Sequence, residues 1–161
     1  MGFEEKTMEN VDKKLCLNNA KAFYKTAGLI DKVCVDFHDE MLAPLVMNLN
    51  FACELFLKYL LMDYCDYYTD IKNVSHSLSN LFDKLEDNAP EIAKKISSQY
   101  EKERGQWNCL SLVDLLKIEE NNFSDFRYMH EKKHNVVTYT SNMNACVYVL
   151  LQVCSDNGKG I

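Results

Sequence analysis

Residues 44–66 read PLVMNLNFACELFLKYLLMDYCD, and this stretch decides the fold. Pro44 suits the first turn of a helix, where its missing N–H costs nothing. The apolar residues after it lie on nearly every side of a helix, which is typical of a helix at the centre of its domain. Asn50, Glu54 and Lys58 interrupt them at intervals of four, so they form one narrow polar stripe. Because unpaired charge is costly in a core, this stripe needs partners.

Helical periodicity also predicts the elements around this central helix. The further helices that we expect cover roughly residues 11–37, 75–85, 90–102, 110–133 and 140–154. Gly28 weakens the first of them and would allow a kink. The 110–133 stretch could instead be two helices with a turn at 121–124, in which case Ser124 or Asp125 would cap the second. The only plausible strand is 136–139. We therefore predict an all-α, up-and-down bundle of five to six helices.

Length and charge limit the class of protein. The 161 residues, 47% of them hydrophobic, suit one domain, which we place at 9–155 between tails at 1–8 and 156–161. The net charge of −6 argues against charge-driven binding to nucleic acid or membrane, so any RNA contact must be local. Polar residues break up 45–64 too often for a membrane span, and the polar N-terminus does not resemble a secretory signal. We expect no membrane partner.

The cysteines indicate a cytoplasmic protein. They number seven, contain no CxxC pair and mostly have apolar neighbours: Cys16, Cys34, Cys53, Cys65, Cys109, Cys146 and Cys154. An odd, scattered set of this kind predicts reduced core thiols rather than a disulfide framework or a zinc site. The chain also has no phosphate-binding glycine loop and no other cofactor motif, so we expect no cofactor.

The only compact cationic segment contains Arg127, one of two arginines in the chain. If this segment is helical, His130, Glu131 and His134 lie three, four and seven residues from Arg127 and share its face. A permanent cation beside two imidazoles suits phosphate chemistry. The same residues could equally form a solvated helix face.

Three motifs in this order resemble the HEPN superfamily of small helical bundles. Residues 50–60 are similar to its N-x-x-x-E-x-x-x-K core helix, and 76–82 are similar to the H-x-L-x-x-L that opens the next helix. Residues 123–131, with Phe123, Phe126, Arg127, Tyr128 and Glu131, resemble the F-x-x-W-R-Y-x-x-E end of one subgroup. Together they cover about 40–134, which is most of the predicted domain.

The resemblance implies a function and a partner. Nuclease members carry an arginine, four to six residues and a histidine, and Arg127 and His134 are separated by six. Such members cleave RNA without metal, through the 2′-hydroxyl, at a homodimer interface. The resemblance thus implies a ribonuclease of the toxin–antitoxin or phage-defence kind, with Arg127 on phosphate and His134 as acid–base. Tyr128 departs from this pattern, because the residue after the arginine is usually small and polar.

A second hypothesis is a non-catalytic HEPN module. Such a module would bind a nucleotide, an RNA or a partner protein such as a nucleotidyltransferase or an antitoxin, and an ion pair of Arg127 with Glu131 or Glu54 would favour it. Under either hypothesis, Glu54 and Lys58 would satisfy each other or reach Arg127 across the bundle, and His76 would cap its own helix or touch a substrate. The further residues that would support the site or contact a substrate are Tyr128, His130 and Glu131. A third possibility is a purely structural or regulatory helical protein.

Residues 130–134 also match HExxH, the zinc-protease helix, with His130 and His134 as ligands and Glu131 as base. We disfavour this zinc hydrolase. Lysines fill both positions between Glu131 and His134, and no His or Glu follows to supply a third ligand. We therefore predict no metal site.

Overall fold

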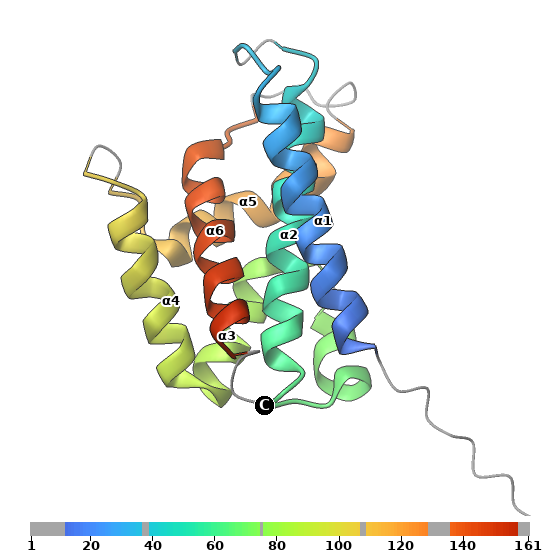
Figure 1. The fold of residues 1–161 in the computed structure, drawn as a ribbon, viewed down its shortest axis with the longest axis vertical. Helices are drawn as coiled ribbons and strands as arrows, with labels where there is room; N and C mark the ends of the chain where they lie inside the picture. The colour runs from blue at the N-terminus through green and yellow to red at the C-terminus, as the bar shows by residue number, and fades with distance from the viewer. Residues whose placement is uncertain (1–11, 37–38, 75, 107–108, 129–135, 158–161) are drawn as a thin grey trace, which may run out of the picture.

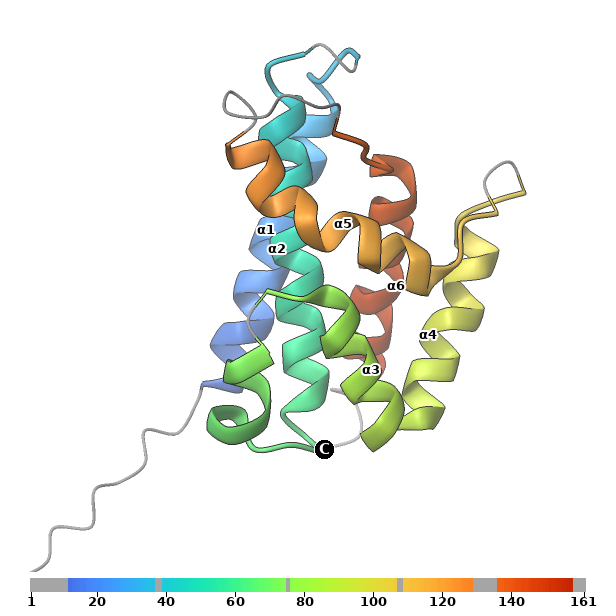
Figure 2. The ribbon, with the colours of Figure 1, turned by 180° about the vertical axis from the view of Figure 1, so that it is seen from behind.

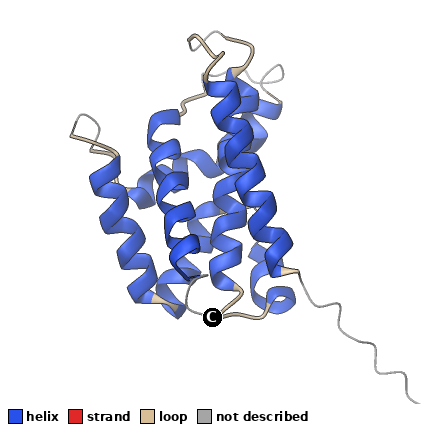
Figure 3. Ribbon diagram, viewed as in Figure 1, coloured by secondary structure: helices blue, strands red, loops and turns tan. Residues whose placement is uncertain are grey.

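The structure is a computed structural model that describes residues 12–36, 39–74, 76–106, 109–128 and 136–157. Within these ranges the chain is helical, and no strand is present (Figure 3). The six α-helices are α1 (Lys13–Asp31), α2 (Leu42–Leu61), α3 (Leu78–Asn88), α4 (Pro90–Glu103), α5 (Leu112–Arg127) and α6 (Thr140–Asn157). Two short helical turns, η1 (Tyr67–Ile71) and η2 (Lys72–Val74), join α2 to α3. The all-α prediction is confirmed.

Helix α2 lies at the centre of the bundle, as its sequence predicts. It packs against α1, α3, α5 and α6, and Figure 1 shows it between α1 and α6. Large side chains such as Phe56, Leu57 and Leu60 are fully buried. Pro44 falls in the first turn, where the missing N–H leaves no helical hydrogen bond unmade. The helix ends at Leu61 rather than near 66, because Asp66 instead caps η1 by accepting from the amides of Tyr68 and Thr69.

The up-and-down prediction holds for only part of the bundle. Helices α1, α2, α4 and α6 run close to the long axis (Figure 1). Helix α5 crosses α2 and α6 obliquely on the other side, where α3 also lies (Figure 2). This crossing brings the middle of α5 onto the start of α3 and its C-terminal end to the top of the bundle.

Several predicted boundaries were wrong. Helix α1 continues without interruption through Gly28 and ends at Asp31, six residues before the predicted end. Helix α3 begins at Leu78, because the Ser77 hydroxyl accepts from the amide of Asn80 and caps it. Helix α4 begins at Pro90, as predicted. The positive φ of Gly105, 76°, follows its C-terminal end.

The second half of α5 also differs from the prediction. The helix is continuous through 121–124, so the alternative of two helices with a cap at Ser124 or Asp125 was wrong. It begins after Ser111, whose hydroxyl accepts from the amide of Asp114, and it ends at Arg127 rather than at 133. Residues 129–135 lie outside the described ranges. The predicted strand at 136–139 is absent; this segment is held by side chains of α5.

No helix in the described ranges combines the length and the apolar character that crossing a bilayer requires. All seven cysteines are free thiols, and Cys53, Cys146 and Cys154 are buried in the core. A hydrogen bond to Cys146 and burial raise the pKa of the Cys53 thiol well above its ordinary value. Burial also raises the pKa of Cys16 to about 11. Such thiols stay protonated near neutral pH and react slowly.

Candidate functional site

The polar stripe of α2 finds its partners inside the bundle. Glu54 is only 6% exposed, and its Oε1 lies 2.6 Å from the Lys58 ammonium one turn later. Its Oε2 lies 2.9 Å from Nδ1 of His76, in the turn before α3. Both carboxylate oxygens are therefore engaged by groups that carry or can carry positive charge. The expectation that Glu54 and Lys58 satisfy each other is confirmed.

His76 connects this buried pair to the surface. Glu54 holds one edge of the imidazole, while 59% of the His76 side chain is exposed. An imidazole anchored through Nδ1 by a carboxylate has a fixed orientation, which is the arrangement that acid–base catalysts and positioned binding groups share. His76 does not cap α3; Ser77 does. The structure therefore unites three of the sequence-predicted residues, Glu54, Lys58 and His76.

The carboxylate of Glu120, on α5, accepts hydrogen bonds from the start of α3. One oxygen of Glu120 accepts from the Ser77 hydroxyl at 2.9 Å, the Ser79 amide at 3.1 Å and the Ser79 hydroxyl at 2.6 Å. A negative charge at a helix N-terminus also interacts favourably with the helix dipole. Glu120 thus fixes the turn that carries His76 against the middle of α5.

A small cavity lies between these groups. Asn50, Glu54, His76, Leu78, Glu119 and Glu120 line it, and its volume of about 10 Å³ leaves room for one water molecule. Asn50 donates to the Glu119 carbonyl at 2.9 Å, while its Oδ1 is buried and has no hydrogen-bond partner within the described residues. A nucleobase cannot enter a space of this size. At this site, any larger ligand must therefore bind on the outer surface.

Glu119 forms a separate buried cluster between α5 and the start of α6. Its carboxylate accepts from the Tyr139 amide at 2.6 Å, the Thr138 hydroxyl at 3.0 Å and the Asn122 side chain at 2.7 Å. Asn122 also donates to the carbonyl of Val137 at 2.8 Å. Burial raises the pKa of the Glu119 carboxyl, while the hydrogen bonds from Tyr139, Asn122 and Thr138 oppose the rise.

Sequence reasoning missed Glu119, Glu120 and Asn122. A signal for two of them was present: Glu119 follows Leu115 by four residues and Asn122 follows Glu119 by three, which places both on the apolar stripe of α5. A polar residue on an apolar stripe requires a buried partner. Glu120 carried no such signal.

Arg127 is the last residue of α5 and is exposed. Its guanidinium lies 5.3 Å from the centre of the Tyr128 ring, a cation–π arrangement. No ion pair joins it to Glu54 or to another described carboxylate. The other arginine, Arg104, instead donates to the Leu110 carbonyl at 2.6 Å and closes the loop between α4 and α5. Arg127 is therefore an exposed arginine that no described carboxylate pairs with.

The remaining sequence-predicted residues, His130, Glu131 and His134, lie outside the described residues. The HExxH hypothesis therefore rests on the sequence alone. Elsewhere in the described ranges, no cluster of three or more His, Cys, Asp or Glu side chains could hold a metal ion.

The fold and these clusters define a helical-bundle protein with an internal carboxylate–lysine–histidine network. Comparisons with protein-family models, with curated proteins and with solved structures find no match for this chain.

Proposed function

We propose that the chain is a HEPN-like, metal-independent endoribonuclease in which Arg127 binds the scissile phosphate and His134 moves the proton. In this reaction the ribose 2′-hydroxyl gives up its proton and its oxygen attacks phosphorus. The P–O5′ bond breaks and the leaving oxygen takes up a proton, which yields a 2′,3′-cyclic phosphate and a 5′-hydroxyl. A guanidinium stabilises the charge that develops on the phosphoryl oxygens. An imidazole exchanges the protons near neutral pH.

The observation that carries this proposal is the state of Arg127. It is exposed at the end of α5, and no described carboxylate neutralises it. The carboxylate that could have done so from α2, Glu54, is already held by Lys58 and His76. Of the two ion pairs that would favour a non-catalytic module, the Arg127–Glu54 pair is therefore not formed. Within the described residues, Arg127 therefore has no anionic partner, and Glu131 lies outside them.

The proposal includes a homodimer, because in the superfamily that the motifs resemble, the arginine and the histidine meet a second copy. Size-exclusion chromatography with light scattering tests this part. An antitoxin or a nucleotidyltransferase is the partner that we would seek in the same genomic neighbourhood.

The test is RNA cleavage by the purified protein in excess EDTA. We expect the parent to cut RNA and both Arg127→Ala and His134→Ala to lose activity by at least about a hundredfold, the scale of a lost acid–base or oxyanion group. Arg127→Lys keeps a positive charge but not the two-pronged geometry, so partial activity is expected. Lys133→Ala serves as the control within the same segment and should cut like the parent.

Intact RNA with the parent protein would reject the nuclease and leave the non-catalytic module. One observation gives that second function weight: the cluster around Glu54 offers only a water-sized cavity, so the outer surface is the part of this region that can receive a larger ligand. A module of this kind would hold RNA through Arg127 without cutting it. Cleavage that EDTA abolishes would instead favour the zinc hydrolase.

A further inference from the structure

We propose that one surface of the protein binds single-stranded RNA beyond the scissile phosphate. The surface consists of Tyr68, Lys72, His76, Arg127 and Tyr128, and we call it the cation–tyrosine surface. This inference rests on the proposed function for the identity of the nucleic acid. It adds the path that the strand follows and the residues that hold it.

Two exposed cation–aromatic pairs mark the ends of this surface. The Lys72 ammonium lies 5.6 Å from the centre of the Tyr68 ring, and the Arg127 guanidinium lies 5.3 Å from that of Tyr128. Tyr68 is 39% exposed and Tyr128 is 43% exposed. A nucleotide presents a phosphate and a flat base, and proteins hold single strands by pairing cations with stacking aromatic rings. Each pair supplies both groups at one place.

His76 follows the first pair along the chain, in the turn before α3. The turns η1 and η2 lead directly to it, and Glu120 fixes its turn against α5 through Ser77 and Ser79. Glu120 and Arg127 are seven residues apart, so they share one face of α5 at a separation of two turns, about 10.5 Å along the axis. In Figure 2 the green turns, the start of α3 and the orange end of α5 follow one edge of the molecule. A strand along this edge would meet all three in order.

Four carboxylates near this edge are hydrogen-bonded within the protein, among them Asp70, which accepts from the Asp66 amide at 3.1 Å. Glu54 is held by Lys58 and His76, Glu120 by the start of α3, and Asp66 by the amides of Tyr68 and Thr69. Bound donors and cations weaken the repulsion that these groups would exert on a phosphate chain. A chain with a net charge of −6 can therefore offer a local surface to RNA.

The chemistry favours a single strand over a duplex. Tyrosine rings stack on bases that are not paired, whereas duplex RNA is recognised through its backbone and shape. With two permanent positive charges, Lys72 and Arg127, the expected affinity is moderate and depends on salt. For single strands the logarithm of affinity falls by about 0.7 per phosphate contact for each logarithm of salt.

The test measures binding with an RNA that the protein cannot cut. A fluorescent 2′-O-methyl oligonucleotide of about ten nucleotides spans a site of this kind and lacks the attacking hydroxyl. We expect the double variant Tyr68→Ala/Lys72→Ala to bind about tenfold or more weakly in fluorescence anisotropy. Its salt slope should shrink by about 0.7, since one phosphate contact is lost.

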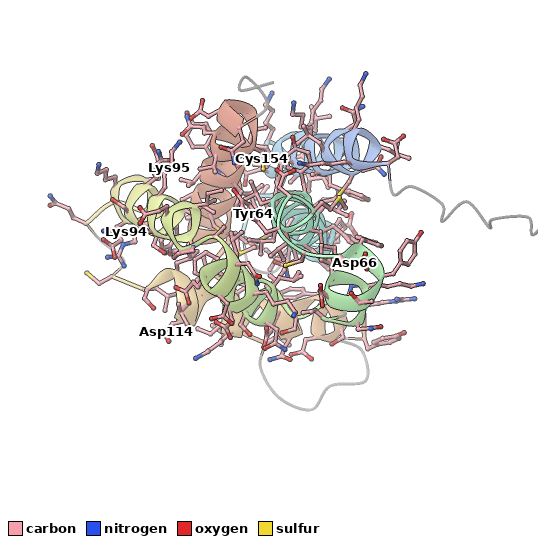
Figure 4. The ribbon with its side chains drawn as sticks, turned by 90° about the horizontal axis from the view of Figure 1, so that it is seen from below. Tyr64, Asp66, Lys94, Lys95, Asp114 and Cys154 are labelled. Atoms are coloured by element: carbon pink, nitrogen blue, oxygen red, sulfur yellow. The ribbon has the colours of Figure 1, made fainter. Side chains whose placement is uncertain are left out.

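The matched control removes the same two residue types elsewhere. Lys94→Ala/Tyr148→Ala changes an exposed lysine on α4 and an exposed tyrosine on α6. Figure 4 shows Lys94 on the opposite side of the bundle from Asp66, where η1 begins. This control should bind RNA like the parent. Thermal melts followed by circular dichroism show that both variants are folded.

Three outcomes overturn the inference: no binding by the parent, equal binding by the parent and the surface variant, or tighter binding of the parent to a duplex than to the single strand. Loss of binding in the surface variant alone supports it. If this loss is seen while unmodified RNA stays uncut in EDTA, the cation–tyrosine surface stands and the nuclease proposal fails. The two proposals are thereby tested separately.

Discussion

Two buried carboxylates of this protein are stabilised in different ways. Glu54 forms an ion pair with the Lys58 ammonium, and its other oxygen lies at hydrogen-bond distance from the His76 imidazole. Glu119, which is fully buried, is surrounded by the uncharged donors of Tyr139, Thr138 and Asn122. The first arrangement cancels charge, whereas the second only replaces the hydrogen bonds of water. The two sites should therefore respond differently to loss of charge and to pH.

Glu54 and Glu119 also differ in where they lie in the bundle. Glu54 lies on the central helix and contacts the partly exposed His76 in the turn before α3. Glu119 instead fastens the 137–139 segment, and hence the start of α6, onto α5. The charged groups around Glu54 lie next to solvent, where their charge can also act on a ligand. The uncharged donors around Glu119 instead connect two segments of the chain.

The largest effect is expected at Glu54. Glu54→Gln keeps the shape of the side chain but leaves the largely buried Lys58 ammonium without an anion, so the free energy of unfolding should fall by about 3 kcal/mol. Urea denaturation measures it. The double variant Glu54→Leu/Lys58→Leu removes both charges and should lie within about 1 kcal/mol of the parent. A double variant as unstable as Glu54→Gln would show that shape rather than charge matters here.

A smaller loss is expected when the hydrogen bonds of Glu119 are removed. Glu119→Ala leaves the donors of Tyr139, Thr138 and Asn122 without their acceptor, so the free energy of unfolding should fall by about 2 kcal/mol. Glu119→Gln keeps one acceptor oxygen and should lose about 1 kcal/mol. Amide hydrogen exchange supplies a local check, because the Tyr139 amide should exchange faster in both. Equal protection of that amide in parent and Ala variant would contradict the role of Glu119 as its anchor.

The pH dependence distinguishes the two carboxylates further. Burial raises the pKa of the Glu119 carboxyl, so the folded protein holds this proton more tightly than the unfolded chain does. The contribution of Glu119 to stability is then complete below its unfolded pKa and declines as the pH rises through the folded value. Compared with Glu119→Gln, which does not titrate there, the parent should lose stability as the pH rises from about 4. If the difference in the free energy of unfolding between the parent and Glu119→Gln stayed constant with pH, the raised pKa of Glu119 would be refuted.

The sequence allowed one of these clusters to be predicted better than the other. The four-residue spacing of Glu54 and Lys58 on an apolar helix predicted that they pair with each other or reach Arg127, and the structure shows the first of these arrangements. His76 could be singled out, but its contact with Glu54 could not, because it depends on how α3 packs against α2. Glu119 and Asn122 lie on the apolar stripe of α5, yet their partners come from a segment that we predicted to be a strand. Its four β-branched or aromatic residues favour a strand locally, and the buried Glu119 carboxylate overrides that preference.

The smallest effect is expected at an exposed ion pair that serves as a reference for Glu54. Lys95 Nζ and Asp156 lie 3.3 Å apart, and their side chains are 42% and 57% exposed. Solvent screens such a pair and its formation restricts two side chains, so Lys95→Ala should change the free energy of unfolding by no more than about 0.5 kcal/mol. This pair, between α4 and α6, also consists of a lysine and a carboxylate, as the Lys58–Glu54 pair does. The two pairs therefore differ mainly in how exposed they are to solvent. A loss at Lys95 as large as that at Glu54 would mean that burial does not set the strength of ion pairs in this bundle, and the comparison between its two carboxylate clusters would lose its physical basis.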